Sequence, residues 1–134
     1  MSKRILVIDD DDLIRSLTTH FLKQGDYDVI TAPNGPEGVK RYEAERPDLI
    51  VLDIAMPDMS GFEVAKSIRE VEERENRAHT PIIILTAYAR SFFLSVGSEA
   101  GIDSYLTKPI TPEQLLSHVE RFLGKPASPA SENI

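Results

Sequence analysis

Five polar residues of this 134-residue chain each stand at or just after the end of a short apolar run. They are Asp9, Asp10, Asp53, Thr86 and Lys108. Carboxylates about 4 Å apart repel by about 1 kcal/mol per pair in water, and by several times that nearer a protein interior. If folding brings the three aspartates together, the site therefore needs a cation.

Oxygen ligands without a histidine or cysteine favour hard divalent cations, so we expect Mg²⁺, or Mn²⁺, at such a cluster. One divalent cation and the ammonium of Lys108 would offset the three negative charges, and a phosphate could then approach a nearly neutral site. An aspartate beside such a cation can attack phosphorus and form an acyl phosphate. Asp53 is the candidate for that reaction, and Thr86 could donate its hydroxyl to a phosphate oxygen.

The apolar runs predict five β-strands with helices between them. The strands are expected at residues 4–8, 28–32, 48–53, 81–87 and 103–107. Three of these runs are nearly continuous in Ile, Val and Leu, which is typical of parallel strands covered on both faces. In the first helix, Leu13, Leu17 and Phe21 follow helical spacing. The alternation predicts an α/β fold with a doubly wound, five-stranded parallel sheet.

The predicted sheet gives the five polar residues a common location. Ligands of an open α/β sheet bind outside the carboxyl ends of the strands, where the strand order reverses. Because each polar residue lies at or just after the carboxyl end of a predicted strand, we expect all five at the same edge of the sheet. The sequence therefore predicts one site there.

Capping residues and composition indicate where the helices and the domain end. Asp12 is predicted as the N-cap of the first helix and Thr111 as the N-cap of the last. The charge run from Glu70 to Arg77 is interpreted as a solvated helix end. We expect one domain over residues 1–123 and a flexible tail or clipped linker over residues 124–134, which contain prolines and small polar residues.

The composition argues against several classes of function. A formal net charge of −7 gives no electrostatic basis for binding nucleic acid or an anionic membrane. The chain has no cysteine, which excludes disulfides, thiolate metal sites and thiol catalysis. No apolar run approaches the ~18 residues of a membrane span, and the N-terminal run is too short for a signal peptide. We expect a cytoplasmic location.

Four segments together resemble the receiver domain of two-component response regulators. They are ILVIDDDDLIR, PDLIVLDIAMPDMSGFEV, TPIIILTAYA and DSYLTKPI, in that family's order. The resemblance implies a flavodoxin-like fold with strand order 2-1-3-4-5. It also implies that a histidine kinase or a histidine phosphotransfer protein donates a phosphoryl group in the presence of Mg²⁺, and that the chain then switches conformation to control a partner.

The resemblance assigns the metal and phosphoryl sites to particular residues. Asp9 and Asp10 would be the acidic metal pair, and Asp53 would be both the phosphoacceptor and a metal ligand. The backbone carbonyl of Ala55 would be the remaining protein ligand. A receiver of this kind is not an enzyme in the usual sense, since only slow self-phosphorylation and self-dephosphorylation are expected of it.

The resemblance also assigns the parts of a switch. Thr86 would be the switch hydroxyl and Tyr105 the switch aromatic, while Lys108 would pair with the phosphate. Pro109 would follow a cis peptide bond.

Partners are implied only by class. Members of the family commonly present the fourth helix, fifth strand and fifth helix to a target protein, and Phe92 and Phe93 fall in the fourth helix region. The subclass stays open between a chemotaxis-type single-domain receiver and the receiver of a hybrid kinase. The sequence identifies neither the cognate kinase nor the target.

Two other functions stay open on the sequence alone. A Mg²⁺-dependent phosphohydrolase would turn over through a phosphoaspartate, but it would need an acid close after Asp53, and the next acid is Asp58, beyond Pro57. A receiver that is never phosphorylated would serve purely as a docking module. The intact set of acidic residues, Thr86 and Lys108 argues against that reading.

Overall fold

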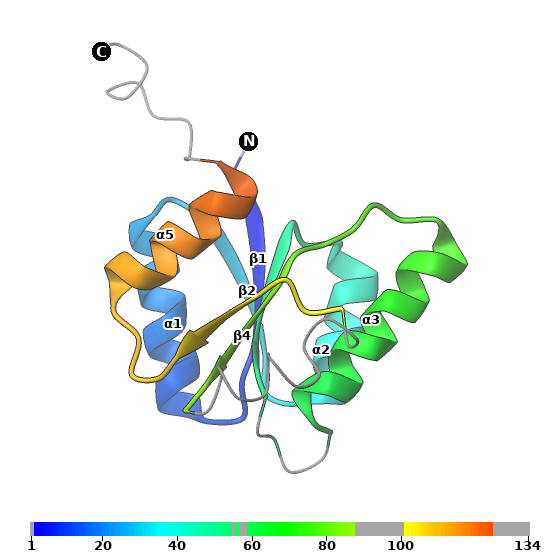
Figure 1. Cartoon of the computed structure of the whole chain (residues 1–134), viewed down its shortest axis with the longest axis horizontal. Coiled ribbons are helices and arrows are strands. Elements are labelled where there is room, and N and C mark those ends of the chain that lie inside the picture. Colours follow the sequence, from blue (N-terminus) through cyan, green and yellow to red (C-terminus); the bar gives the residue numbers. More distant parts are fainter. Residues whose placement is uncertain (1, 55, 57–58, 88–100, 125–134) are drawn as a thin grey trace.

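The structure is a computed structural model that describes residues 2–54, 56, 59–87 and 101–124. Its centre is a sheet of five parallel strands in the order β2-β1-β3-β4-β5 (Figure 1). The strands are β1 (Arg4–Ile8), β2 (Asp28–Ala32), β3 (Leu49–Asp53), β4 (Ile82–Thr86) and β5 (Ser104–Thr107). Each strand end lies within one residue of its predicted position. The predicted fold class and strand order are confirmed.

In the described part of the chain, four helices cover the two faces of the sheet. They are α1 (Asp12–Gln24), α2 (Gly35–Glu45), α3 (Gly61–Glu75) and α5 (Pro112–Leu123). Helices α1 and α5 pack together on one face, and α2 and α3 pack together on the other (Figure 1). The predicted fourth helix, with Phe92 and Phe93, and the predicted tail beyond Gly124 lie outside the described residues.

Alternate residues of the central strands fill two separate cores. Ile50 and Leu52 of β3 belong to the core under α2 and α3. Leu49 and Val51 belong to the core under α1 and α5. All four side chains are fully buried, because helices cover both faces of the strand. This arrangement explains why the sequence of β3 is continuously apolar.

The buried face of α1 includes only part of its apolar spacing. Leu13 and Leu17 are 68% and 41% exposed, whereas Thr18 and Leu22 are buried. Successive helical positions lie about 100° apart, so a face that includes position 18 excludes position 17. Of the three apolar residues with helical spacing, Phe21 packs, half-buried, against the core under α1 and α5, while Leu13 and Leu17 lie outside it.

The helix caps agree with the sequence except at α1. Asp11 is the N-cap instead of Asp12, since its extended backbone lets its carboxylate accept a hydrogen bond from the Ile14 N–H at 3.0 Å. Asp12 begins the first helical turn. Thr111 is the N-cap of α5, as predicted, and Gln114 completes a capping box with it.

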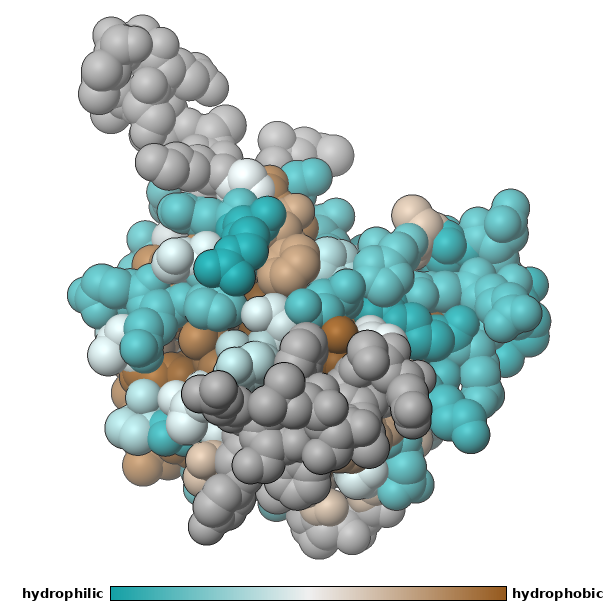
Figure 2. Space-filling model, in the orientation of Figure 1, coloured by the Kyte–Doolittle hydropathy of each residue, from teal (hydrophilic) through white to brown (hydrophobic). Residues whose placement is uncertain are grey.

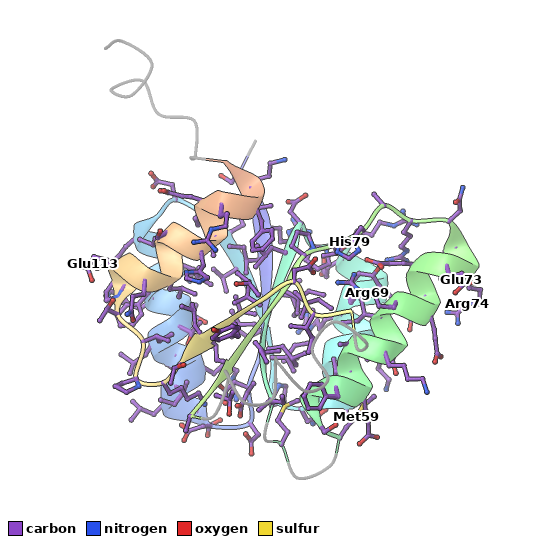
Figure 3. The ribbon with its side chains drawn as sticks, viewed as in Figure 1. Met59, Arg69, Glu73, Arg74, His79 and Glu113 are labelled. Carbon is purple, nitrogen blue, oxygen red and sulfur yellow. The ribbon has the colours of Figure 1, made fainter. Side chains whose placement is uncertain are left out.

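A network of ion pairs joins α3 to the loops that precede β4 and β5. Arg69 of α3 pairs with Glu72 at 2.8 Å and with Asp103 at 2.9 Å. It also donates hydrogen bonds to backbone carbonyls in the loops before β4 and β5. His79 Nε2 lies 2.7 Å from Asp103 Oδ1, and both Arg69 and His79 are visible on the α3 side in Figure 3. We call these four residues the paired cluster.

The charge run from Glu70 to Arg77 is not wholly a solvated helix end, and that prediction was wrong in part. Glu72 is buried within the paired cluster. The Arg77 side chain is 10% exposed and lies over the Tyr42 ring, with its guanidinium carbon 4.9 Å from the ring centroid. Its guanidinium donates to the Tyr42 and Glu43 carbonyls at the end of α2, where a cation is favourable. Such contacts between helices cannot be seen in the charge pattern of one helix.

The outer surface of α3 is polar. Figure 2 shows hydrophilic side chains over this helix, and Figure 3 shows Glu73 and Arg74 pointing outward from it. Within the described residues, no helix combines the length and the apolar character needed to cross a membrane.

Candidate functional site

The three aspartates predicted to form a cation site lie together at the carboxyl edge of the sheet. Carboxylate oxygens of Asp9, Asp10 and Asp53 lie within 4.8 Å of one another. Their proximity follows from topology, because β1 and β3 are neighbouring parallel strands and both end here. Asp9 and Asp53 are buried, whereas Asp10 is exposed. We call these three residues and Lys108 the acidic edge.

Asp9 is held by the main chain on both sides. Its N–H donates to the Ala32 carbonyl at 3.2 Å, and its Oδ1 accepts the Asp11 N–H at 2.9 Å. Its Oδ2 is buried and has no hydrogen-bond partner among the described residues. Burial, with a smaller contribution from the neighbouring Asp53 carboxylate, raises the pKa of Asp9 to about 6. The second oxygen is therefore placed to bind something electropositive.

Lys108 is the cation that the structure places against these carboxylates. Its Nζ lies 3.4 Å from Asp53 Oδ1 and 3.8 Å from Asp9 Oδ2. The Lys108–Pro109 peptide bond is cis, as predicted. The Lys108 N–H donates to the Thr86 carbonyl at 3.0 Å, so the ends of β4 and β5 are joined beside the site.

The predicted switch residues lie on β4, the strand next to that of Asp53, and on β5, the strand beyond it. Thr86 is the last residue of β4 and is buried. Tyr105 lies in β5 opposite Ile84 and packs, half-buried, against the core under α2 and α3. The structure thus places Thr86 at the carboxyl edge of the sheet and Tyr105 within β5, two residues before that strand ends, while their switching roles stay predictions. Ala55, the predicted source of a backbone ligand, lies outside the described residues.

Two residues near the site were not identified from the sequence. Gly61 begins α3, and a Cβ there would lie 2.8 Å from Ile54 Cα and 2.9 Å from the Asp53 carbonyl oxygen. Arg15 of α1 donates to the Asp9 carbonyl at 2.8 Å. The available signals were a glycine at a helix start and an arginine three residues after Asp12, but neither pattern reveals a contact with another element.

The acidic edge fits a divalent cation. Three carboxylates and one ammonium leave two negative charges unbalanced, and a single divalent cation would neutralise them. Asp9 Oδ2 supports this fit, since a buried carboxylate oxygen without a hydrogen-bond partner is unfavourable. Carboxylate oxygens suit Mg²⁺ or Mn²⁺ better than softer metals.

The chain is similar to known signalling proteins over most of its length. The family model of the response regulator receiver domain matches residues 5–120. The alkaline phosphatase synthesis transcriptional regulatory protein PhoP of Bacillus subtilis is 41% identical over 134 residues. That alignment covers 98% of this chain and 54% of PhoP, so the chain spans about half the length of this relative.

Two solved structures show the same arrangement of elements. The chemotaxis protein CheY4 of Vibrio cholerae has a TM-score of 0.83 and 33% identity, over 91% of this chain and 99% of that chain. The receiver domain of a sensor histidine kinase of Pseudomonas aeruginosa has a TM-score of 0.77 and 26% identity, over 92% of this chain and 99% of that chain. That second structure holds a magnesium ion coordinated in its active site cleft.

Proposed function

The chain belongs to the response regulator receiver domain family, and on that premise we propose that it accepts a phosphoryl group on Asp53 in the presence of Mg²⁺. The donor is the phosphohistidine of a histidine kinase or of a histidine phosphotransfer protein. One observation supports this proposal most strongly. A buried aspartate at the end of β3 lies against two further aspartates, with the Lys108 ammonium 3.4 Å away.

Asp9, Asp10 and Asp53 would hold the cation, with the backbone carbonyl of Ala55 as the remaining protein ligand. Mg²⁺, or Mn²⁺, offsets negative charge on the transferring phosphoryl group. The support is the oxygen-only ligand set and the charge imbalance of the acidic edge. The magnesium ion in the related Pseudomonas aeruginosa receiver agrees with this choice.

The proposed transfer exchanges one bond to phosphorus for another. A carboxylate oxygen of Asp53 bonds to phosphorus as the bond between phosphorus and the donor imidazole nitrogen breaks. The electron pair of the broken bond stays on that nitrogen. Because the other ring nitrogen of the donor carries a proton, the released side chain is a neutral imidazole. Lys108 pairs with the phosphoryl oxygens, and Thr86 donates its hydroxyl to one of them. Positioning and electrostatics supply the catalysis.

Phosphorylation would then act as a switch. It replaces one negative charge on Asp53 by about two and adds acceptor oxygens. These changes favour a conformation in which Thr86 and Lys108 lie closer to the phosphoryl group. Movement of Thr86 leaves space into which Tyr105 turns. The phosphoryl group thereby stabilises one of two conformations through its different contacts in each.

The chain is a stoichiometric phosphoacceptor and not a turnover enzyme. Self-phosphorylation from a small donor and self-dephosphorylation are slow. We place the exchange in the cytoplasm, with a downstream protein target that binds through β5, α5 and the segment between β4 and β5.

Phosphorylation from a small acyl phosphate tests the proposal directly. With Mg²⁺ present, intact-protein mass spectrometry should show one phosphoryl group on the wild type and none on Asp53→Asn. Asp26→Asn is the matched control, since Asp26 is exposed and its positive φ of 65° suits asparagine. Equal incorporation by Asp53→Asn would overturn the assignment.

The same experiment separates the alternatives. Continuous release of phosphate, many turnovers per chain, would identify a phosphohydrolase. A wild type that acquires no phosphoryl group and shows no Mg²⁺-dependent change would identify a docking module.

A further inference from the structure

We propose that Arg15 is a positioning residue that holds the turn between β1 and α1 in its cation-binding shape before any ion arrives. The inference rests on the proposed function, because it concerns the same Mg²⁺ site. It adds to that site a supporting residue from α1, a helix that supplies none of the proposed metal ligands.

Arg15 reaches back from the first turn of α1 to the turn that precedes it. One guanidinium nitrogen donates to the Asp9 carbonyl at 2.8 Å, and another pairs with Asp12 Oδ1 at 2.6 Å. The backbone N–H of Arg15 also donates to the Asp11 carbonyl at 2.9 Å. The Arg15 side chain is 20% exposed although Asp12 is 90% exposed, so the guanidinium lies in toward the turn.

These contacts fix the peptide plane that joins the two proposed metal ligands. The Asp9–Asp10 peptide is trans, so a bond that orients the Asp9 carbonyl also orients the Asp10 N–H on the opposite side. Among the described residues, no hydrogen bond holds the Asp10 side chain. The Cα–Cβ bond from which that carboxylate extends is therefore directed by the main chain that Arg15 holds.

An arginine suits this role better than a lysine. Its planar guanidinium can donate to a carbonyl and a carboxylate at once, whereas a lysine ammonium acts as a single point charge. The positioning role of Arg15 can also be separated from the effect of its positive charge on Mg²⁺ binding. A nearby positive charge repels a divalent cation, so charge removal alone would tighten Mg²⁺ binding, while loss of positioning would weaken it.

Because loss of charge and loss of positioning would change the Mg²⁺ affinity in opposite directions, Arg15→Gln distinguishes between them. We expect Mg²⁺ affinity, measured by titration calorimetry, to fall about 10-fold or more, as for other residues that orient metal ligands. Arg15→Lys should lie between the wild type and Arg15→Gln. In metal-free protein, the Asp11 amide, which is bonded to Asp9 Oδ1, should exchange its hydrogen faster in Arg15→Gln.

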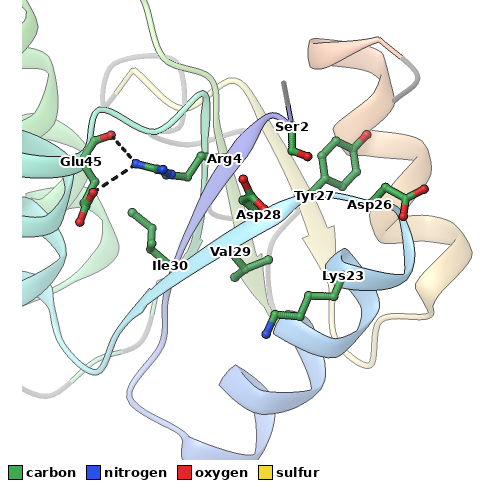
Figure 4. Close-up of a pocket in the computed structure, with 9 residues that line it drawn as sticks. All are labelled: Ser2, Arg4, Lys23, Asp26, Tyr27, Asp28, Val29, Ile30 and Glu45. Atoms are coloured by element: carbon green, nitrogen blue, oxygen red, sulfur yellow. Dashed lines mark hydrogen bonds and ion pairs between the residues drawn. The ribbon is translucent and has the colours of Figure 1, made fainter. Parts of the chain in front are cut away.

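Arg4→Gln is the matched control. Arg4 also donates to a backbone carbonyl and a carboxylate, both of Glu45, as the dashed lines in Figure 4 show. It stands at the opposite end of β1, so its removal deletes the same charge without touching the turn. Its variant should bind Mg²⁺ with wild-type affinity.

Wild-type or tighter Mg²⁺ binding by Arg15→Gln, with unchanged exchange at Asp11, would overturn the positioning role. Failure of the wild type itself to bind Mg²⁺ would instead contradict the proposed function. The exchange rate at Asp11 in metal-free protein would then still decide whether Arg15 orders the turn.

Discussion

The paired cluster and the acidic edge lie at opposite ends of the same sheet and differ in how their carboxylates are bonded. In the paired cluster, Asp103 accepts from Arg69, from His79 and from the Ile82 N–H. Glu72 accepts from Arg69 and from the backbone. In the acidic edge, three carboxylates lie near one ammonium, and the buried Asp9 Oδ2 has no hydrogen-bond partner among the described residues.

The difference shows how a structural cluster can be distinguished from a binding site. Both contain buried carboxylates and both lie at strand ends. Every carboxylate oxygen of the paired cluster accepts a hydrogen bond, whereas in the acidic edge the buried Asp9 Oδ2 accepts none from the described residues. An added cation would therefore find an unsatisfied oxygen only in the acidic edge. Hydrogen-bond satisfaction of the carboxylate oxygens therefore separates the two clusters better than burial does.

Removal of Arg69 should produce the largest change in stability. Arg69→Met leaves the buried Glu72 carboxylate without its cation, and the loss of one partner from a buried pair costs about 3–5 kcal/mol. Urea unfolding measures this change in the free energy of unfolding. Mg²⁺ affinity of the folded variant should stay near that of the wild type. A loss below about 1 kcal/mol, the range of surface ion pairs, would mean that the paired cluster does not stabilise the fold.

Removal of Asp10 should have the converse effect. Asp10→Ala takes away an exposed carboxylate, so the free energy of unfolding should change by no more than about 0.5 kcal/mol. Mg²⁺-dependent phosphorylation should fall at least about 100-fold, since even residues that only support metal ligands contribute 10- to 100-fold. The initial rate with a small acyl phosphate measures this. Retention of the wild-type rate would remove Asp10 from the metal site.

The pH dependence of stability should differ between the two clusters because burial raises the pKa of Asp9 to about 6 from 3.8. The folded chain then holds the Asp9 proton more tightly than the unfolded chain does. This stabilisation is complete below the unfolded value of 3.8 and is lost as the pH rises through about 6. As the pH rises through this range, the free energy of unfolding of the metal-free protein should therefore fall by up to about 3 kcal/mol because of Asp9.

Asp9→Asn provides the comparison for that titration. The amide can still accept the Asp11 N–H, but it cannot ionise. Urea unfolding in a chelator, from about pH 4 to about pH 8, should show a smaller decline for the variant than for the wild type. Equal slopes would mean that Asp9 is not the group responsible. Added Mg²⁺ should restore stability to the wild type at the higher pH.

The smallest expected effect concerns the first turn of α1. Asp11→Ala removes the N-cap and should cost about 1 kcal/mol. Asp12→Ala removes only a first-turn charge and should cost about 0.3–1 kcal/mol. Thermal or urea unfolding measures both. A larger loss for Asp12→Ala would show that its ion pair with Arg15 outweighs the cap.

The sequence could predict what depends on strand position. Asp9, Asp53 and Lys108 follow apolar runs, and parallel strands end at the same edge, so their proximity follows from the order of elements alone. Contacts between distant elements could not be predicted in this way. Arg69 meets Asp103 across 34 positions, and the contact of Gly61 with Asp53 depends on how closely α3 approaches β3. Neither contact leaves a periodic signal.

The backbone hydrogen bond from Lys108 to Thr86 has a consequence for the kinetics of the proposed switch. Because the two strand ends are joined, a shift of either backbone toward a phosphoryl group is expected to displace the other. Their motion would then be concerted, with one relaxation rate for both loops. Relaxation-dispersion measurements at the two backbone amides should give the same exchange rate, and two different rates would mean that the bond breaks before the loops close.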